Sequence, residues 1–252
     1  MTRVLLFWSG GKDAAWTLYR LQQDQSVHVI GLITTFDAAS DRSAMHSVRR
    51  GLLKRQAIAA DLTLIEVDIP WPCSNVTYES IINSAILRSR DDLDIHALAF
   101  GDLFLSDIRS FREKQFSELG IELIFPLWGI PTKDLAIEMI GGKLRAKIAC
   151  VDTNMLPGHF VGREFDLTFL EDLPAGIDHC GENGEFHTFL WSGPMLKKAI
   201  PIYFDYSLFC FFCICFLWFT LNFTINICSC MYVTLRGIFK NQARQNQQIS
   251  CE

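Results

Sequence analysis

The chain has 252 residues, with 28 acidic and 23 basic side chains that give a net charge of −5 at neutral pH. This length fits one large domain or two small ones, and the acidic balance argues against nucleic acid as a partner. The first 200 residues contain only Cys73, Cys150 and Cys180, a sparse use that is typical of a reducing, cytoplasmic compartment. No signal peptide is expected, because the first apolar run meets Ser-Gly-Gly at once.

Strand and helix patterns alternate from the N-terminus to about residue 152. Apolar runs typical of buried strands lie at 4–8, 27–34, 62–67, 97–101, 122–125 and 145–151. Helical patterns lie between them, at 13–23, 45–60, 75–90, 106–119 and 132–141. Strands separated by helices predict an α/β fold with a parallel sheet covered on both faces. Thr132 is expected to cap the last of these helices.

The end of this alternation predicts three parts of the chain. Residues 1–152 are expected to form the α/β domain. Residues 153–200 are expected to form a small substrate-side region, with loops, one short helix at 165–173 and the polar run CGENGEFHTFLWSGP. Residues 201–252 are an atypical hydrophobic tail that is uncharged from 206 to 235 and rich in Phe and Cys.

Three interpretations of this tail remain open. It is long enough for a membrane anchor, since about 20 apolar residues suffice, and Arg236, Lys240 and Arg244 follow it as they would on the cytoplasmic side. It could also be a buried core helix. The abrupt change of composition, without a linker, favours the third interpretation, in which the tail is foreign to the fold, for example translated non-coding DNA.

The stretch FWSGGKDA, residues 7–14, joins the first strand to the first helix. Ligands of parallel sheets bind at the carboxyl ends of the strands, and a helix N-terminus there favours an anion. A Walker A loop is excluded, because Leu6 stands where its first glycine belongs and Asp13 where its Ser or Thr belongs. The dinucleotide fingerprint also fails, since the two glycines are adjacent and no third follows.

The run Ser9-Gly10-Gly11-Lys12-Asp13 resembles the Ser-Gly-Gly-x-Asp-Ser signature of the PP-loop ATP pyrophosphatases, also called adenine nucleotide alpha hydrolases. The glycines let the backbone close around phosphates, and the serine adds a hydroxyl donor. The lysine can neutralise phosphate charge, and the aspartate can hold Mg²⁺, a hard cation. Ala14 replaces the final serine of the signature, so one hydroxyl donor is lost.

Two further segments narrow the resemblance. The run FGDLFLSDIRSFREKQFSELGIELIFPLWG at 100–129 and the run CGENGEFHTFLWSGP at 180–194 are similar to segments of the diphthine–ammonia ligase family. The resemblance covers residues 3 to about 196. It implies a parallel-sheet adenine nucleotide alpha hydrolase domain, HUP-like and Rossmann-like, with a small substrate-side region.

The resemblance also implies an activity. ATP would activate a carboxylate as an adenylate with release of pyrophosphate, and ammonia would convert the adenylate to an amide. In that family the carboxylate belongs to diphthine, a modified histidine on elongation factor 2. The implied cofactors are ATP and Mg²⁺, and the implied partners are ATP, ammonia and diphthine-modified elongation factor 2, with no nucleic acid and a membrane only if the tail is an anchor.

Several polar residues are candidates for the nucleotide site. Asp102 follows the fourth strand and could bind Mg²⁺ or the ribose. Thr34, His46 and Gly101 are expected to contact the nucleotide as well, with His46 at the start of the second helix. Asp152 follows the sixth strand and could line the site. Arg109 and Arg112 lie three residues apart on one helix and share a face, so either could grip a phosphate or a carboxylate; each also has the plain alternative of a solvated surface.

The polar run contributes the remaining catalytic candidates, Glu182, Glu185 and His187. Glu185 and His187 point the same way if the chain is extended there. Such a group could position ammonia, act as a general base or bind a cationic substrate, or it could be an exposed structural turn. Cys180 is expected to pack or to contact substrate rather than to act as a nucleophile.

Two alternatives to the amide ligase remain. One is a PP-loop enzyme that acts on another small substrate. The other is a nucleotide-binding homologue that is weakened by Ala14 and the altered tail.

Overall fold

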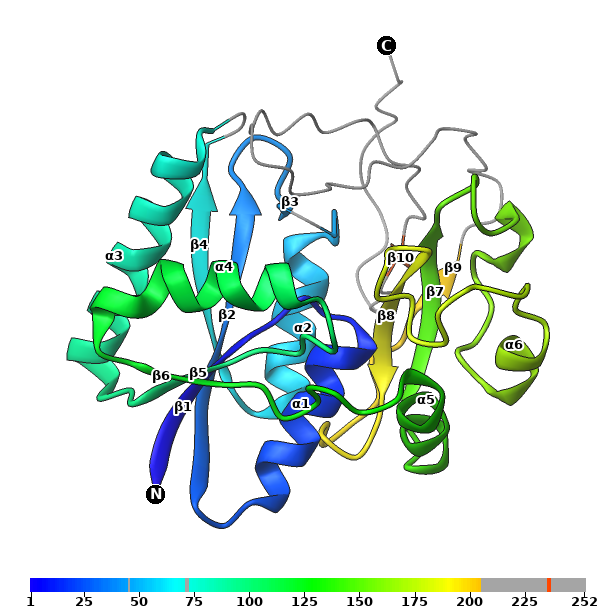
Figure 1. Cartoon of the computed structure of the whole chain (residues 1–252), viewed down its shortest axis with the longest axis horizontal. Helices are drawn as coiled ribbons and strands as arrows, with labels where there is room; N and C mark the ends of the chain where they lie inside the picture. The colour runs from blue at the N-terminus through cyan, green and yellow to red at the C-terminus, as the bar shows by residue number, and fades with distance from the viewer. Residues whose placement is uncertain (45, 71–72, 205–234, 237–252) are drawn as a thin grey trace, which may run out of the picture.

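The computed structural model describes residues 1–44, 46–70, 73–204 and 235–236 (Figure 1). The strands are β1 (Thr2–Phe7), β2 (Val27–Asp37), β3 (Arg42–Ser43), β4 (Thr63–Ile69), β5 (Ala97–Ala99), β6 (Glu122–Ile124), β7 (Arg145–Val151), β8 (Phe186–Ser192), β9 (Tyr203–Phe204) and β10 (Leu235–Arg236). The helices are α1 (Lys12–Gln23), α2 (Arg50–Ala60), α3 (Asn75–Leu93), α4 (Ser106–Phe116), α5 (Thr132–Gly141) and α6 (Leu167–Glu171), with 3₁₀ turns at Ser117–Leu119 and Gly158–Phe160.

A parallel sheet organises the N-terminal half of the chain. Its strands lie in the order β4-β2-β1-β5-β6, and every neighbouring pair is parallel. The short β3 adds an antiparallel partner beside the end of β2. Because sequential parallel strands need a crossover, the helices α1 to α4 each return the chain to the same end of the sheet. The predicted α/β, Rossmann-like fold with a parallel sheet is confirmed.

Helices cover both faces of this sheet. The side chains of β1 alternate between the two faces and pack against different helices on each. Val4 and Leu6 are fully buried in the core that includes the apolar sides of α1 and α2. Leu5, between them, is fully buried in the second core, with apolar residues of α3 and the end of α4. Successive side chains of a strand point to opposite faces, so this unbroken apolar run suits a central strand.

The strand at 145–151 forms as predicted but does not join the parallel sheet. This β7 pairs antiparallel with β8 in a separate two-stranded sheet, which lies beside α1 and α5 in Figure 1. Loops were predicted where β8 runs. The strand was hidden because the polar run leads into it, although its centre, Thr188 to Leu190, is buried. The backbone N–H of Leu190 donates to the carbonyl of Gly10 at 2.9 Å, which ties β8 to the end of β1.

One helix start and one helix cap differ from the predictions. The second helix begins at Arg50 rather than at residue 45, because the chain before it forms β3 and a turn in which Ser47 has a φ of +52°. His46 therefore lies in the connection between β3 and α2. Thr132 does not cap α5: Pro131 occupies the cap position, and the hydroxyl of Thr132 donates to Asp178 instead.

Among the residues that the structure describes, no helix has the length and apolar character needed to cross a membrane. The stretch at 206–235, for which an anchor was one interpretation, lies outside the described residues except for its last position.

Candidate functional site

The glycine loop, residues 9–11, lies where the sequence predicts it, between the carboxyl end of β1 and the N-terminus of α1. Gly10 has a φ of +83°, which side chains disfavour, and Gly11 is the N-cap residue of α1 without any side-chain cap. The amides of the first helical turn lack intrahelical partners, and the helix dipole adds positive potential. The loop thus has the backbone geometry and potential that favour an anion at this end of the helix.

A cleft of about 320 Å³ opens at this loop, between the parallel sheet and the β7–β8 unit. Most of the residues predicted for the site line it: Ser9, Gly11, Lys12, Asp13, Thr34, His46, Gly101, Asp102, Glu182 and His187. Gly10 and Glu185 are not in the lining. The structure therefore brings together candidates from both halves of the chain.

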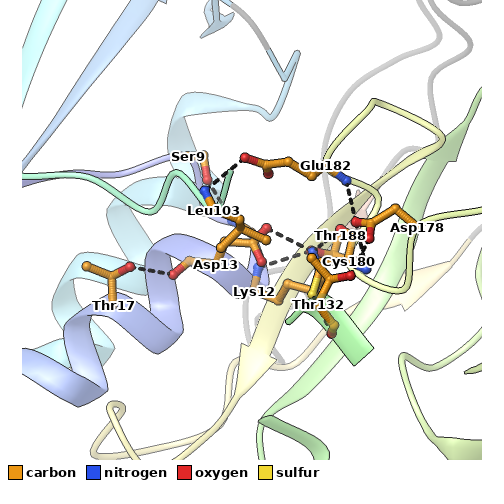
Figure 2. A network of polar contacts seen from close by, with 11 residues as sticks. Ser9, Lys12, Asp13, Thr17, Leu103, Thr132, Asp178, Cys180, Glu182 and Thr188 are labelled. Atoms are coloured by element: carbon orange, nitrogen blue, oxygen red, sulfur yellow. Dashed lines mark hydrogen bonds and ion pairs between the residues drawn. The ribbon is translucent and has the colours of Figure 1, made fainter. Parts of the chain in front are cut away.

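Lys12 and Asp13 form a close ion pair at the floor of the cleft. The Nζ of Lys12 lies 2.8 Å from an Asp13 carboxylate oxygen and also donates to the carbonyl of Cys180 (Figure 2). Only 2% of Lys12 is exposed, and its Nζ lies 5.5 Å from the ring centres of both Phe165 and Phe186. Burial lowers the pKa of Lys12, but the negative charges around it, with Asp13 the largest of them, together outweigh burial and raise that pKa.

A second loop, residues 178–185, faces this pair and is called here the acidic loop. Asp178 organises it: one carboxylate oxygen accepts from the backbone N–H groups of Cys180 and Glu182 at 3.1 and 3.0 Å, and the other accepts from the Thr132 hydroxyl (Figure 2). Such bonds from an aspartate to the amides that follow it close a turn. Asp178 thereby sets the position of Glu182.

Glu182 lines the cleft, and a backbone amide from outside the acidic loop holds its carboxylate. Its Oε1 accepts from the backbone N–H of Leu103 at 2.9 Å (Figure 2). Burial, followed by the charge of Asp13, raises the pKa of Glu182 to about 8. A carboxyl group with a pKa near neutrality can both take up and release a proton under cellular conditions.

Glu185 is placed differently from its neighbour His187, against the expectation that the two point the same way. Glu185 is fully buried, and its Oε1 accepts from Asp178 N and Asn183 Nδ2 within the acidic loop. His187 belongs to β8 and lines the cleft. The extended run begins only at Phe186, so Glu185 lies in the turn and the alternation of the strand does not extend to it.

His46 and His187 meet edge to face in the cleft, with ring centres 4.9 Å apart, although His46 comes from the connection before α2 and His187 from β8. Burial lowers the pKa of His46 to about 4, with help from Arg112. Burial also lowers the pKa of His187 to about 3, with contributions from His46 and Lys12. Both rings are therefore neutral at neutral pH, and each has one nitrogen that can accept a hydrogen bond.

Arg112 and Asp102 line the cleft and form a bidentate ion pair, with N–O distances of 2.5 and 3.0 Å. Arg112 also lies over the Phe100 ring, at 4.4 Å. Arg109, by contrast, pairs with Glu113 on its own helix and does not line the cleft. Of the two arginines, the structure places Arg112 at the site.

Gly101 and Thr34 shape the cleft through the backbone. A Cβ at Gly101 would come within 2.9 Å of the Ala14 nitrogen, so only glycine lets the chain after β5 approach α1 this closely. The hydroxyl of Thr34 donates to the carbonyl of Trp8 at 2.6 Å, which joins the ends of β1 and β2.

Two residues that organise the site, Asp178 and Thr188, were not predicted from the sequence. The Thr188 hydroxyl accepts from the backbone N–H of Lys12 at 3.0 Å and so supplies the cap that Gly11 lacks. The signal for Asp178 was its place two residues before Cys180-Gly181, as in an Asx turn. Thr188 had no local signal, since its partner lies 176 residues earlier in the chain.

Cys180 is buried, and its thiol donates to the carbonyl of Thr132 at 3.4 Å. Burial raises the pKa of this thiol, so it stays protonated at neutral pH. The packing role expected for it agrees with this environment. Asp152 lies outside the lining of the cleft, and its backbone N–H donates to the carbonyl of Glu185.

Comparison with known proteins gives matches over both halves of the chain. Residues 2–123 match the diphthamide synthase N-terminal domain, and residues 131–217 match the diphthamide synthase C-terminal domain. The second match runs past residue 200, where the sequence analysis placed the start of the tail. The diphthine–ammonia ligase of Homo sapiens is 30% identical over 115 residues, and that of Bos taurus is 29% identical over 117 residues.

Each of these two matches covers 43% of this chain and 43% of the relative, so the chain matches less than half the length of either protein. The N-terminal domain match contains the glycine loop, and the C-terminal domain match contains the acidic loop. The chain therefore belongs to the diphthamide synthase family.

Proposed function

We propose that this chain is an ATP-dependent amide ligase that forms an acyl-adenylate and converts it to an amide with ammonia. The observation that carries the proposal is one cleft shared by the anion-binding glycine loop and the acidic loop with Glu182. The names of the human and bovine relatives, diphthine–ammonia ligases, support it. On this basis diphthine-modified elongation factor 2 is the proposed acceptor and the cytoplasm the proposed location.

The proposed reaction has two steps. The glycine loop grips the β- and γ-phosphates, a substrate carboxylate oxygen attacks the α-phosphorus, and the bond to the bridging oxygen breaks to release pyrophosphate. The ammonia nitrogen then attacks the acyl carbon, AMP leaves, and ammonia loses one proton. Backbone N–H groups of the glycine loop that are fixed in place before the phosphates bind would lower the barrier without reorganisation.

Glu182 is the proposed acceptor of that proton. Its side chain is half-buried, lines the cleft and is held by the Leu103 amide, so its position is defined before substrate binds. Lys12 acts indirectly in this scheme, because its ammonium is already bonded to Asp13 and to the Cys180 carbonyl. We propose that its charge favours phosphate in the cleft while its contacts hold the acidic loop.

Asp13 fits the proposed role of Mg²⁺ ligand. One carboxylate oxygen pairs with Lys12, and the other, Oδ1, is buried without a hydrogen-bond partner. Within the described ranges, no group of three or more His, Cys, Asp or Glu side chains could hold a metal ion. A Mg²⁺ at Asp13 would therefore need phosphate oxygens to complete its coordination, as is usual for this ion. When bound, Mg²⁺ would neutralise charge that develops on the phosphates.

The decisive experiment follows the products of ATP. The full chain is incubated with ATP, Mg²⁺ and ammonium, with and without diphthine-modified elongation factor 2, and the nucleotides are separated while the acceptor is weighed by mass spectrometry. We expect AMP, pyrophosphate and an acceptor that gains one amide, and loss of all three with Asp13→Asn. Formation of ADP and phosphate would contradict the proposal.

Two other outcomes would identify the alternatives. AMP and pyrophosphate without amidation would mean a different small substrate. ATP binding without turnover would mean a weakened homologue, and restoring the signature serine with Ala14→Ser would then test whether the missing hydroxyl is the cause. Ala14 lies in the first turn of α1 and is 4% exposed, next to Gly101.

A further inference from the structure

Gln56, on α2, joins three segments that build the cleft. Its side-chain nitrogen donates to the carbonyl of Gly10 at 2.9 Å and to the carbonyl of Leu190 at 2.8 Å. Its side-chain oxygen accepts from the indole N–H of Trp8 at 2.8 Å. Gln56 is fully buried and is not in the lining of the cleft, so any influence on a ligand passes through these partners.

The orientation of this amide follows from the chemistry of its partners. An indole N–H can only donate, and backbone carbonyls can only accept. A reversed amide would lose all three bonds and place like groups against one another. Each donor hydrogen of Gln56 is therefore committed to a carbonyl, one on the glycine loop and one on β8.

The hydrogen bond from Gln56 to the Gly10 carbonyl affects the orientation of the peptide between Gly10 and Gly11. The Gly10 carbonyl accepts a second hydrogen bond, from Leu190 N at 2.9 Å, so two donors hold it on the side of β8 and α2. In a planar trans peptide the carbonyl and the next N–H point in opposite directions. The N–H of Gly11 is thereby turned away from β8, and it lies 3.3 Å from the hydroxyl oxygen of Ser9, which lines the cleft.

A peptide between two glycines is the easiest kind to rotate, because neither flanking residue carries a Cβ. Rotation would turn the Gly10 carbonyl toward the cleft and replace a donor by a partial negative charge at the anion site. The absence of a Cβ at Gly10 also leaves room for the Gln56 side chain, since a Cβ there would fall 2.8 Å from the Gln56 side-chain oxygen.

We propose that Gln56 is a positioning residue that locks the peptide between Gly10 and Gly11 in the orientation that binds pyrophosphate. The inference rests on the proposed function, in which the glycine loop holds the β- and γ-phosphates of ATP. It adds that the affinity of the glycine loop for phosphates depends on the buried side-chain amide of Gln56, which lies outside the cleft. This amide bonds both the loop and β8.

The test measures ligand binding to the full chain by titration calorimetry. The variants are Gln56→Glu, which keeps the shape but removes both donors, and Gln56→Met, which removes the polar group. The probes are inorganic pyrophosphate and ATP, each with Mg²⁺, and adenosine, which has no phosphate. We expect both variants to bind pyrophosphate and ATP about tenfold or more weakly, while adenosine binding stays within about twofold.

Leu52→Ala is the matched control. Leu52 lies on the same helix and packs against Phe189 of β8, so its truncation destabilises the same contact without touching Gly10. We expect it to lower the melting temperature and to leave pyrophosphate affinity unchanged. Equal losses for all three probes in the Gln56 variants would indicate general damage and overturn the inference.

A pH series adds a signature that simple destabilisation lacks. A protonated glutamic acid regains one O–H donor, so the deficit of Gln56→Glu relative to the original chain should shrink as the pH falls, and that of Gln56→Met should not. If the original chain binds ATP and both variants bind it equally well, only the inference fails. If the original chain binds neither ATP nor pyrophosphate, the proposed function fails with it.

Discussion

Replacing Lys12 by methionine tests the central ion pair of the cleft. Met keeps the length and apolar stem of the side chain but removes the ammonium that contacts Asp13 and the Cys180 carbonyl. Lys12 is 2% exposed and the Asp13 side chain 26%, so the aspartate would be left largely desolvated without its counter-ion. Breaking such a buried pair from one side costs about 3–5 kcal/mol, and we expect about 3 kcal/mol because Asp13 keeps some solvent.

Thermal unfolding followed by circular dichroism at neutral pH measures this loss. For a domain of this size about 3 kcal/mol corresponds to a drop of roughly 6–12 °C in melting temperature. Lys197→Met is the matched control: its ion pair with Asp61 has the same chemistry at 2.5 Å, but the two side chains are 71% and 69% exposed. We expect less than about 1 kcal/mol there.

The double variant Lys12→Met/Asp13→Asn separates the charge from the packing. Removing the unpaired carboxylate should recover about 1 kcal/mol or more relative to Lys12→Met alone. Two results would refute the reasoning: a Lys12→Met loss no larger than that of Lys197→Met, or a double variant whose loss is the sum of the single ones.

Three further predictions concern the cleft. Because the pKa values of His46 and His187 are lowered to about 4 and about 3, the folded state binds fewer protons than the unfolded one below the usual value of 6.5. Stability should therefore fall between about pH 7 and pH 5, by roughly 1–2 kcal/mol per histidine, and replacing both by Gln should flatten this slope in urea titrations. Gly101→Ala should force the chain after β5 away from α1 and cost about 1–3 kcal/mol, with weaker ATP binding in calorimetry; unchanged affinity would contradict the close approach. Asp178→Ala should release the amides that hold Glu182, lowering turnover at least tenfold while ATP affinity changes little, and equal effects on both would argue against a positioning role.

The parallel sheet and the glycine loop could be predicted from patterns of neighbouring residues in the sequence. Apolar runs of strand length followed by helical periods locate β1, α1 and their connection within a residue or two, because period and turn chemistry are properties of neighbouring residues. The same reasoning placed most of the candidate residues from the N-terminal half on the cleft, since the carboxyl ends of parallel strands meet at one edge of the sheet. It failed at β8 and Glu185, where a polar turn and a strand follow each other without a break.

Local sequence patterns were enough to predict the Rossmann-like α/β fold, and they also predict a phosphate site at residues 9–13. Only the tertiary structure decided which partners complete the site. Lys12 meets a carbonyl 168 residues later in the chain, and Gln56 meets partners 46 and 134 residues away. These contacts depend on how β8 docks beside α1, and that docking follows from burial summed over many side chains, which no short stretch of sequence records.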